Sequence, residues 1–313
     1  MTERRREGAR IAVDIGGTFT DLVLVVGGRV VANAKVLTTP SDPSVAVEAG
    51  ITRLLAHTPA DRVTEVVHGT TLVANALIER KGATTALIAT KGFKDTISIR
   101  RELRYDLYDL FLEMPEPLVP RRLRFEATER ILADGEIDTA LDADEIRRLA
   151  RRLRRNGVEA VAVAFLHSYR NPEHERRAGD LLRRELPEMY VSLSSDVSPE
   201  LGEFARTSTV IANAYVLPLI DRYLEMLQKR LTDQGLSAAL RIMLSTGGGG
   251  VAGVETARRF PVRLLESGPA AGAVSAGFWG SREGRDDVLA FDMGGTTATA
   301  TSGRPSGRSC GER

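Results

Sequence analysis

The sequence contains a single cysteine, Cys310, in 313 residues, so it can form no internal disulfide and no cysteine cluster for a metal. Lys and Arg number 43 against 42 Asp and Glu, a balance that gives no electrostatic attraction to nucleic acid or to an anionic membrane. Apolar runs such as VEAVAVAFL are as long as a strand, whereas a membrane helix needs about 20 residues. The charged N-terminus MTERRREGAR lacks the apolar segment of a signal peptide. We therefore expect a soluble cytoplasmic protein without a nucleic-acid or membrane partner.

Strand and helix patterns alternate along most of the chain. Residues 10–37 predict a three-stranded meander, and the continuous apolar runs at 84–90 and 158–168 predict buried strands. Ser44 and Asp142 are the expected N-caps of two of the helices between strands. Such alternation predicts an α/β fold in which helices cover a parallel or mixed sheet.

Less regular patterns separate and follow these elements. Residues 100–120 combine charges, aromatic residues and three prolines, which predicts an irregular excursion. Residues 199–235 predict a long helix with a kink or break at Pro218. A later helix opens at Ser267 with Gly268 and Pro269, and its N-terminus could face an anion. Residues 1–9 and 301–313 are expected to be disordered because they lack apolar periodicity.

One short motif occurs twice, each time after an apolar strand: DIGGTFTD at 14–21 and DMGGTT at 292–297. Adjacent glycines let the backbone turn tightly, and successive N–H groups in such a turn can bind an anion. A carboxylate at the strand end can hold Mg²⁺, which bridges to phosphate oxygens. A tight hairpin alone would explain one copy, but two copies favour ATP held between two loops. The sequence contains neither a P-loop nor a Gly-x-Gly-x-x-Gly turn.

The candidate residues follow from this motif. Asp14 and Asp292 are the expected Mg²⁺ ligands, with a capping role in the turn as the alternative. The remaining positions are candidate nucleotide-binding residues or simple turn residues, and among their hydroxyls we favour Thr18 and Thr296 as phosphate donors. These positions are Gly16, Gly17, Thr18, Thr20, Asp21, Gly294, Gly295, Thr296 and Thr297.

The two loops resemble phosphate 1 and phosphate 2 of the actin/sugar kinase/Hsp70 superfamily. Longer strings, among them HGTTLVANALIERKGA, TKGFKDTISIRR, FLHSYRNPEHE and ESGPAAGAVSA, resemble the hydantoinase A/oxoprolinase family from about residue 10 to 297. The resemblance implies an RNase H-like, actin-like ATPase fold with a mixed sheet flanked by helices. It also implies a family N-terminal domain at 10–190 and the start of the main domain at 191–300.

In that family, the resemblance implies hydrolytic opening of a cyclic amide of the hydantoin or 5-oxoproline type. ATP, with Mg²⁺ or another divalent metal, phosphorylates the ring carbonyl, and the A-type subunit works with a B-type subunit. His68 lies at a strand end before a helix, where it could polarise the substrate carbonyl or act as an acid or base. A histidine satisfied by the local turn is the alternative. For His174 we favour a capping role, and Arg206 is either a substrate contact or a solvated helix residue.

The sequence departs from the family pattern after the second loop. Family members are longer, and the run TDLVLVV that follows the first loop has no counterpart after Thr297. We therefore expect a truncated second half, an exposed strand edge and weak or no activity of this chain alone. An ATP-dependent ketone carboxylase subunit, or a non-catalytic fragment that docks on a B-type subunit, are the alternative functions. A sugar kinase is disfavoured, because the strings HGTTLVANAL and FLHSYRNPEHE are not typical of sugar kinases.

Overall fold

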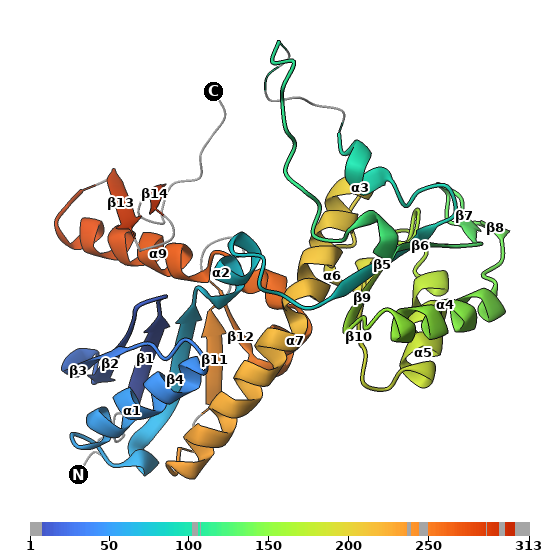
Figure 1. Ribbon diagram of the computed structural model, residues 1–313. Helices are drawn as coiled ribbons and strands as arrows, with labels where there is room; N and C mark the ends of the chain where they lie inside the picture. Colours follow the sequence, from blue (N-terminus) through green and yellow to red (C-terminus); the bar gives the residue numbers. More distant parts are fainter. Residues whose placement is uncertain are drawn as a thin grey trace. The chain divides into compact units, whose positions relative to one another are not determined.

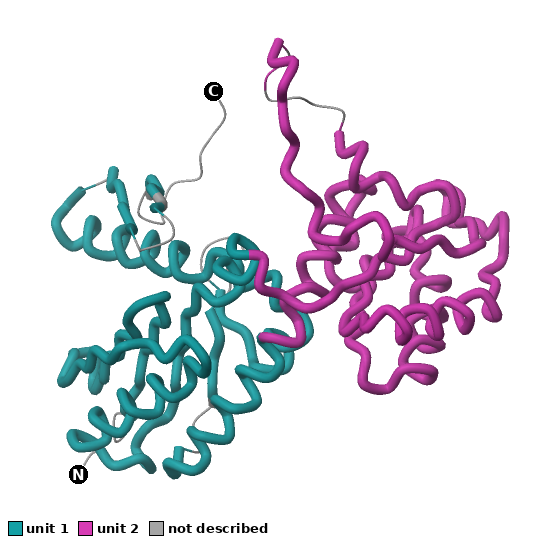
Figure 2. The backbone as a smooth tube through the Cα atoms, in the orientation of Figure 1, with its two compact units in different colours: residues 1–79, 220–313 teal, residues 80–219 magenta. Residues whose placement is uncertain are grey.

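The computed structural model describes residues 8–101, 106, 108–236, 239–243, 250–285, 287–293 and 298–303. The chain forms two compact units, shown in Figure 2: unit 1 comprises residues 1–79 and 220–313, and unit 2 comprises residues 80–219. The second unit is thus inserted into the first. The chain returns to unit 1 at Ile220, within a long helix, and the family-domain division expected near residue 190 stays a prediction.

Unit 1 contains a mixed six-stranded sheet in the order β12-β11-β4-β1-β2-β3. The first three strands form the predicted antiparallel meander, and β4 and β11 extend the sheet in parallel from β1. The edge strand β12 is antiparallel to β11. The strands are β1 (Ala9–Ile15), β2 (Phe19–Val26), β3 (Arg29–Leu37), β4 (Val63–Thr70), β11 (Ala239–Met243) and β12 (Val251–Gly253).

One face of this sheet is covered by two helices, α1 (Pro43–Leu55) and the C-terminal part of α7 (Glu203–Asp233), as Figure 1 shows. Side chains in β1 alternate between buried and exposed, as expected for a strand with one covered face. Arg230 of α7 joins the helices by ion pairs with Glu48 and, at 2.9 Å, with Asp42. Asp42 also caps α1 in place of the expected Ser44, whose backbone N–H it accepts at 3.0 Å.

A separate hairpin follows in unit 1, formed by β13 (Val288–Met293) and β14 (Ala298–Gly303), with α9 (Ser267–Arg282) packed against it (Figure 1). The expected absence of a second strand is therefore wrong, although β14 is short and polar. The expectation of a disordered tail fails for residues 301–303, while 304–313 and 1–7 lie outside the described residues. The remaining elements of this unit are η1 (Ala60–Arg62), α2 (Leu72–Ile78), α8 (Val254–Arg259) and η3 (Pro261–Leu264).

Unit 2 is built on a parallel four-stranded sheet in the order β10-β9-β5-β6. Every residue of β5 (Thr85–Thr90) and β9 (Ala160–Ala164) is buried, as their apolar sequences predict. Asp142 caps α4 as expected, because its carboxylate accepts the N–H groups of Asp144 and Glu145, both at 2.9 Å. The other elements are β6 (Arg124–Ala127), β10 (Tyr190–Leu193), α4 (Ala143–Arg155), α5 (Glu173–Glu185), α3 (Thr96–Ile99), η2 (Arg121–Leu123), β7 (Arg130–Ile131), β8 (Ile137–Thr139) and α6 (Ser194–Val197).

Helix α7 runs without interruption through Pro218, so of the kink or break expected there, the break does not occur. The residues around the proline are buried, with Val216 and Ile220 fully inaccessible to solvent, and this packing supports the helix where one backbone hydrogen bond is lost. Although α7 is long, no helix in the described part of the chain combines the length and apolar character that crossing a membrane requires.

Candidate functional site

The first Asp-x-Gly-Gly-Thr motif forms the turn between β1 and β2. Asp14 pairs with Asp21 across the hairpin, and Ile15 pairs with Thr20. The N–H of Gly16 donates to the carbonyl of Phe19 at 2.9 Å and closes the turn. A Cβ atom at position 16 would lie 3.2 Å from the same carbonyl oxygen, so this close backbone approach favours glycine.

The turn leaves two backbone donors available to a ligand. Gly17 and Thr18 are exposed, and their N–H groups have no acceptor among the residues that the structure describes. Thr38 fixes the turn from the β3 side, since its N–H donates to the carbonyl of Thr18 and its hydroxyl to that of Gly16, both at 2.9 Å. Two successive free N–H groups in a fixed turn form a site suited to an anion such as a phosphate.

Two carboxylates, Asp14 and Asp21, flank this turn, and the charge of a third, Asp292, acts on Asp14. Asp14 reaches solvent, but partial burial, together with the negative charges of Asp292 and Asp21, raises the pKa of its carboxyl above the usual value. Asp21 is ion-paired with Lys35, whose Nζ lies 2.9 Å from its carboxylate. A nearby cation would therefore stabilise the ionised form of Asp14.

These carboxylates do not form a metal site made by the protein alone. Among the described residues, no group of three or more His, Cys, Asp or Glu side chains is placed to hold a metal ion. Mg²⁺ at nucleotide sites is commonly held by one or two carboxylates, with phosphate oxygens and water completing its shell. Asp14 and Asp292 fit this kind of site, in which the metal arrives together with a phosphate.

The second motif occupies the corresponding position of the β13–β14 hairpin. Asp292 pairs with Thr299 and Met293 with Ala298, which reproduces the spacing of the Asp14–Asp21 and Ile15–Thr20 pairs. The repeated motif is thus a repeated hairpin. The expected phosphate-binding residues of the second turn, Gly294, Gly295, Thr296 and Thr297, lie outside the described residues, and their role stays a prediction.

The N-terminus of α9 lies beside the first turn. Thr71 donates to the carbonyl of Ile15 through both its N–H, at 3.2 Å, and its hydroxyl, at 3.1 Å. Ser267 donates to the carbonyl of Thr70 at 2.8 Å, and a Cβ atom on Gly268 would lie 3.5 Å from the Thr71 methyl group. The sequence predicted the helix start at Ser267. It did not indicate the role of Thr71 beside the turn, because Thr71 contacts a backbone oxygen that is distant in sequence.

Thr20 does not have the phosphate-facing position that the sequence suggested. Its side chain is fully buried, and its hydroxyl is hydrogen-bonded to that of Thr38 at 3.0 Å. Residue 20 pairs with the buried Ile15, so it points to the covered face of the hairpin. The structure therefore gives Thr20 a role in holding the turn.

His68 lies in the core of unit 1. It is fully buried and pairs in register with Val13 on the covered face of the sheet, and its Nε2 lies 2.7 Å from the Tyr223 hydroxyl of α7. Burial lowers the pKa of the imidazole from 6.5 to about 4, partly offset by the Val13 backbone, so the ring is neutral near pH 7. This position gives no support to the expected contact with a substrate carbonyl.

The buried imidazole predicts a pH-dependent stability. Below pH 6.5 the unfolded chain binds a proton at His68 that the folded chain does not take up until about pH 4. The free energy of unfolding should therefore fall by about 3 kcal/mol between these pH values through this residue alone. Urea titrations of the wild-type chain and His68→Asn across this range test it, and equal pH slopes in the two proteins would contradict it.

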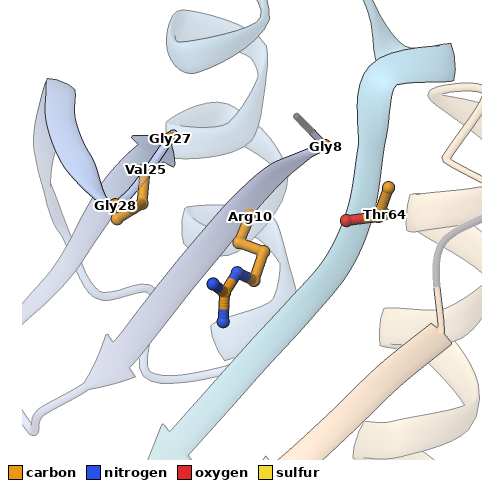
Figure 3. A pocket seen from close by; sticks show the side chains of 6 residues that line it. All are labelled: Gly8, Arg10, Val25, Gly27, Gly28 and Thr64. Atoms are coloured by element: carbon orange, nitrogen blue, oxygen red, sulfur yellow. The ribbon is translucent and has the colours of Figure 1, made fainter. Parts of the chain in front are cut away.

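A hollow of about 350 Å³ lies at the opposite end of β1 from Asp14. Figure 3 shows its six lining residues, which are Gly8, Arg10, Val25, Gly27, Gly28 and Thr64. Among the described residues that line it, Arg10 is the only one with a charged side chain. The hollow therefore shares no residue with the phosphate-type turn and is not part of the candidate site.

The mixed sheet of unit 1, with an Asp-x-Gly-Gly-Thr hairpin at its centre and a second such hairpin in the same unit, defines an α/β protein with an actin-like fold. Two family models match the chain: the hydantoinase/oxoprolinase N-terminal region over residues 10–186, and hydantoinase/oxoprolinase over residues 206–304. The chain belongs to the hydantoinase/oxoprolinase family, as its sequence motifs predicted.

Relatives and solved structures agree with this assignment. The chain is 36% identical to caprolactamase subunit alpha of Pseudomonas jessenii, over 93% of this chain and 43% of that protein. It is 32% identical to 5-oxoprolinase of Saccharomyces cerevisiae, over 92% of this chain and 25% of that protein.

The crystal structure of the Pseudomonas jessenii ATP-dependent caprolactamase superposes with a TM-score of 0.82 at 34% identity, covering 94% of this chain and 43% of that one. Nucleotide-free acetone carboxylase superposes with a TM-score of 0.84 at 27% identity, covering 95% and 44%. The chain thus spans less than half the length of these relatives.

Proposed function

We propose that this chain provides the ATP-binding part of an A-type subunit that opens a cyclic amide of the hydantoin or 5-oxoproline type. The proposal rests on the β1–β2 turn, where the free N–H groups of Gly17 and Thr18 lie beside Asp14. The negative charges of Asp21 and Asp292 disfavour the ionised form of the Asp14 carboxyl. Similarity to an ATP-dependent caprolactamase and a 5-oxoprolinase supports the reaction type. We propose that the reaction takes place in the cytoplasm, where ATP is available.

The residues of the turn fit separate tasks in this chemistry. ATP, when bound, supplies the phosphoryl group that makes the ring carbonyl carbon electrophilic enough for attack by water. The N–H groups of Gly17 and Thr18 would hold phosphate oxygens, and the carboxylates of Asp14 and Asp292 would hold Mg²⁺ or another divalent metal. The protein thus contributes positioning and charge neutralisation, which carry most of the rate in phosphoryl transfer.

The complete reaction needs a partner. The caprolactamase relative is named as an alpha subunit, and the chain spans 43% of its length. We propose a B-type subunit of the same family as that partner, with a small cyclic amide as the shared substrate. The chain by itself should therefore show weak or no turnover.

A second candidate function is an ATP-dependent ketone carboxylase subunit. The observation in its favour is the TM-score of 0.84 with acetone carboxylase. The two reactions share the activation of a carbonyl oxygen by ATP and differ in the second reactant, which is water in one and bicarbonate in the other. A fragment that only docks on a B-type subunit is the third candidate, and it predicts partner binding without ATP hydrolysis.

The test is an ADP-release assay of the purified chain mixed with a purified B-type subunit of the family. We expect release that depends on a cyclic amide, offered as 5-oxoproline, hydantoin or caprolactam, and little release from the chain alone. Release that requires bicarbonate and a ketone would replace the hydrolase with the carboxylase. Stable complex formation without ADP release under any of these conditions would contradict both enzymatic functions.

A further inference from the structure

A segment of unit 2, residues 106 and 108–116, exposes three large apolar side chains and carries several acids; we refer to it as the arm. Tyr108, Leu110 and Phe111 are 93%, 90% and 89% exposed, which is far above the exposure usual for such side chains. Figure 1 shows the arm as a green loop that projects away from the helices and strands of its unit. Three adjacent apolar side chains at this exposure indicate a surface that another molecule covers.

The base of the arm is fixed, so its apolar tip is presented from a defined position. Arg100 donates to the carbonyl of Pro115, and Arg80 donates to the carbonyl of Glu116 at 2.6 Å. Immediately after the arm the chain re-enters the core, where Val119 is fully buried and accepts a hydrogen bond from Arg124 at 3.0 Å. The two arginine contacts therefore hold the end of the arm next to the folded unit.

The tip also has local order. The N–H of Tyr108 donates to the Asp106 carboxylate at 3.0 Å, and the N–H of Phe111 donates to the Asp109 carboxylate at 2.8 Å. Short turns of this kind, made by an aspartate with its own backbone, limit the conformations of the residues between them. Less conformational freedom is then lost when the apolar tip is buried against a partner.

The charge of the arm indicates what kind of surface fits it. Residues 106–116 contain four acids, Asp106, Asp109, Glu113 and Glu116, and no Lys or Arg. An anionic membrane or a nucleic acid would be repelled by this segment. A protein groove with an apolar floor and a rim of Lys and Arg would complement it in both respects.

We propose that the arm is the segment through which this chain docks on its B-type subunit, in an apolar groove rimmed by Lys and Arg. The proposal rests on the proposed function, which requires such a subunit. Tyr108, Leu110 and Phe111 are the anchors of the interface, because large apolar side chains that become fully buried dominate binding energy. Asp106 and Asp109 contribute the electrostatic steering.

The test is a calorimetric titration of the purified chain with a purified B-type subunit, compared with Phe111→Asp and with the pair Leu110→Ser and Phe111→Ser. We expect each variant to weaken the complex by about 30-fold or more. The matched control is Leu201→Asp, which changes an apolar residue of unit 2 that is 75% exposed and lies outside the arm. It should leave the affinity unchanged. The affinity for Mg²⁺·ATP, measured on the same proteins, separates the arm from the nucleotide site in unit 1.

Each outcome of these titrations supports or overturns one of the two proposals, the docking arm or the nucleotide site. Weaker complexes with unchanged melting temperature and unchanged Mg²⁺·ATP affinity support the proposal. Equal affinity of the arm variants and the wild-type chain, or no complex with the wild-type chain, would overturn it while leaving nucleotide binding in place. Loss of self-association in the variants, seen by sedimentation, would assign the arm to a second copy of this chain and would also overturn it. Failure of Mg²⁺·ATP binding in all proteins would count against the proposed function instead.

Discussion

Replacing Arg206 by methionine should lower the free energy of unfolding of unit 2 by about 3 to 5 kcal/mol, the range typical when one partner of a buried charged network is removed. Arg206 is 2% exposed. It donates to the Ser194 hydroxyl at 3.2 Å and to the carbonyls of Glu200 at 2.9 Å and Phe165 at 3.1 Å. Its loss would leave these three acceptors without a hydrogen-bond donor and one buried carboxylate without a nearby positive charge.

That carboxylate belongs to Glu175, which is fully buried. It accepts the Ser194 hydroxyl at 2.6 Å and the N–H groups of Phe165 and Ser195, both at 2.8 Å. Burial raises the pKa of Glu175 and lowers that of Arg206, while the charge of Glu175 partly restores the pKa of Arg206. Each of the two charges therefore stabilises the ionised form of the other. The Ser194 hydroxyl, at the carboxyl ends of β9 and β10, links them because it accepts from Arg206 and donates to Glu175.

Urea denaturation followed by circular dichroism measures the loss. The matched control is Arg177→Met, an exposed position on α5 of the same unit, which should change stability by less than about 0.5 kcal/mol. Adding Glu175→Gln to Arg206→Met should recover part of the stability, because it removes the unbalanced charge. A change below about 1 kcal/mol for Arg206→Met would show that the network is not a stabilising one.

The second large effect concerns the nucleotide. Asp14→Ala should weaken the binding of Mg²⁺·ATP by about 100-fold, which corresponds to about 2.7 kcal/mol. Without the metal, Asp14→Ala should instead strengthen the binding of ATP. The substitution removes one of the three carboxylates, Asp14, Asp21 and Asp292, whose negative charges repel the ATP phosphates. The combination of a loss with Mg²⁺ and a gain without it distinguishes a metal ligand from a merely structural aspartate.

Calorimetry with ATP in the presence of Mg²⁺, and separately in the presence of EDTA, measures both effects. Asp61→Ala, an exposed acid in the 3-10 helix η1, serves as the control and should leave both affinities unchanged. Equal losses for Asp14→Ala under the two conditions would contradict a role for Asp14 at the metal.

The sequence predicted the meander, the buried parallel strands and the repeated Asp-x-Gly-Gly-Thr motif, because each depends on local pattern and spacing. The turn at Gly16 and Gly17 could be located for the same reason. The helix start at α1 was misplaced by two residues, since both Asp42 and Ser44 are good caps and Pro43 favours the earlier one. Local rules cannot rank two adjacent capping residues without knowing where the chain enters the helix.

The roles of His68 and Arg206 could not be found locally, because both depend on long-range packing. His68 is buried by Tyr223 of α7, a residue 155 positions later in the chain. Arg206 looks like one of many arginines on a helix until β9, β10 and α5 supply its buried partners. The strand β14 was missed because its sequence, ATATSG, lacks the apolar residues of a strand, and its pairing with β13 alone defines it.

Hydrogen–deuterium exchange of the purified chain, with and without a nonhydrolysable ATP analogue and Mg²⁺, tests whether the β1–β2 turn binds phosphate. We expect the analogue to slow exchange at the amides of Gly17 and Thr18, with smaller effects at Thr71 and Gly268, and we expect this protection to require Mg²⁺. Unchanged exchange at the β1–β2 turn at saturating analogue, or protection confined to unit 2, would contradict the assignment of this turn as the phosphate-binding site.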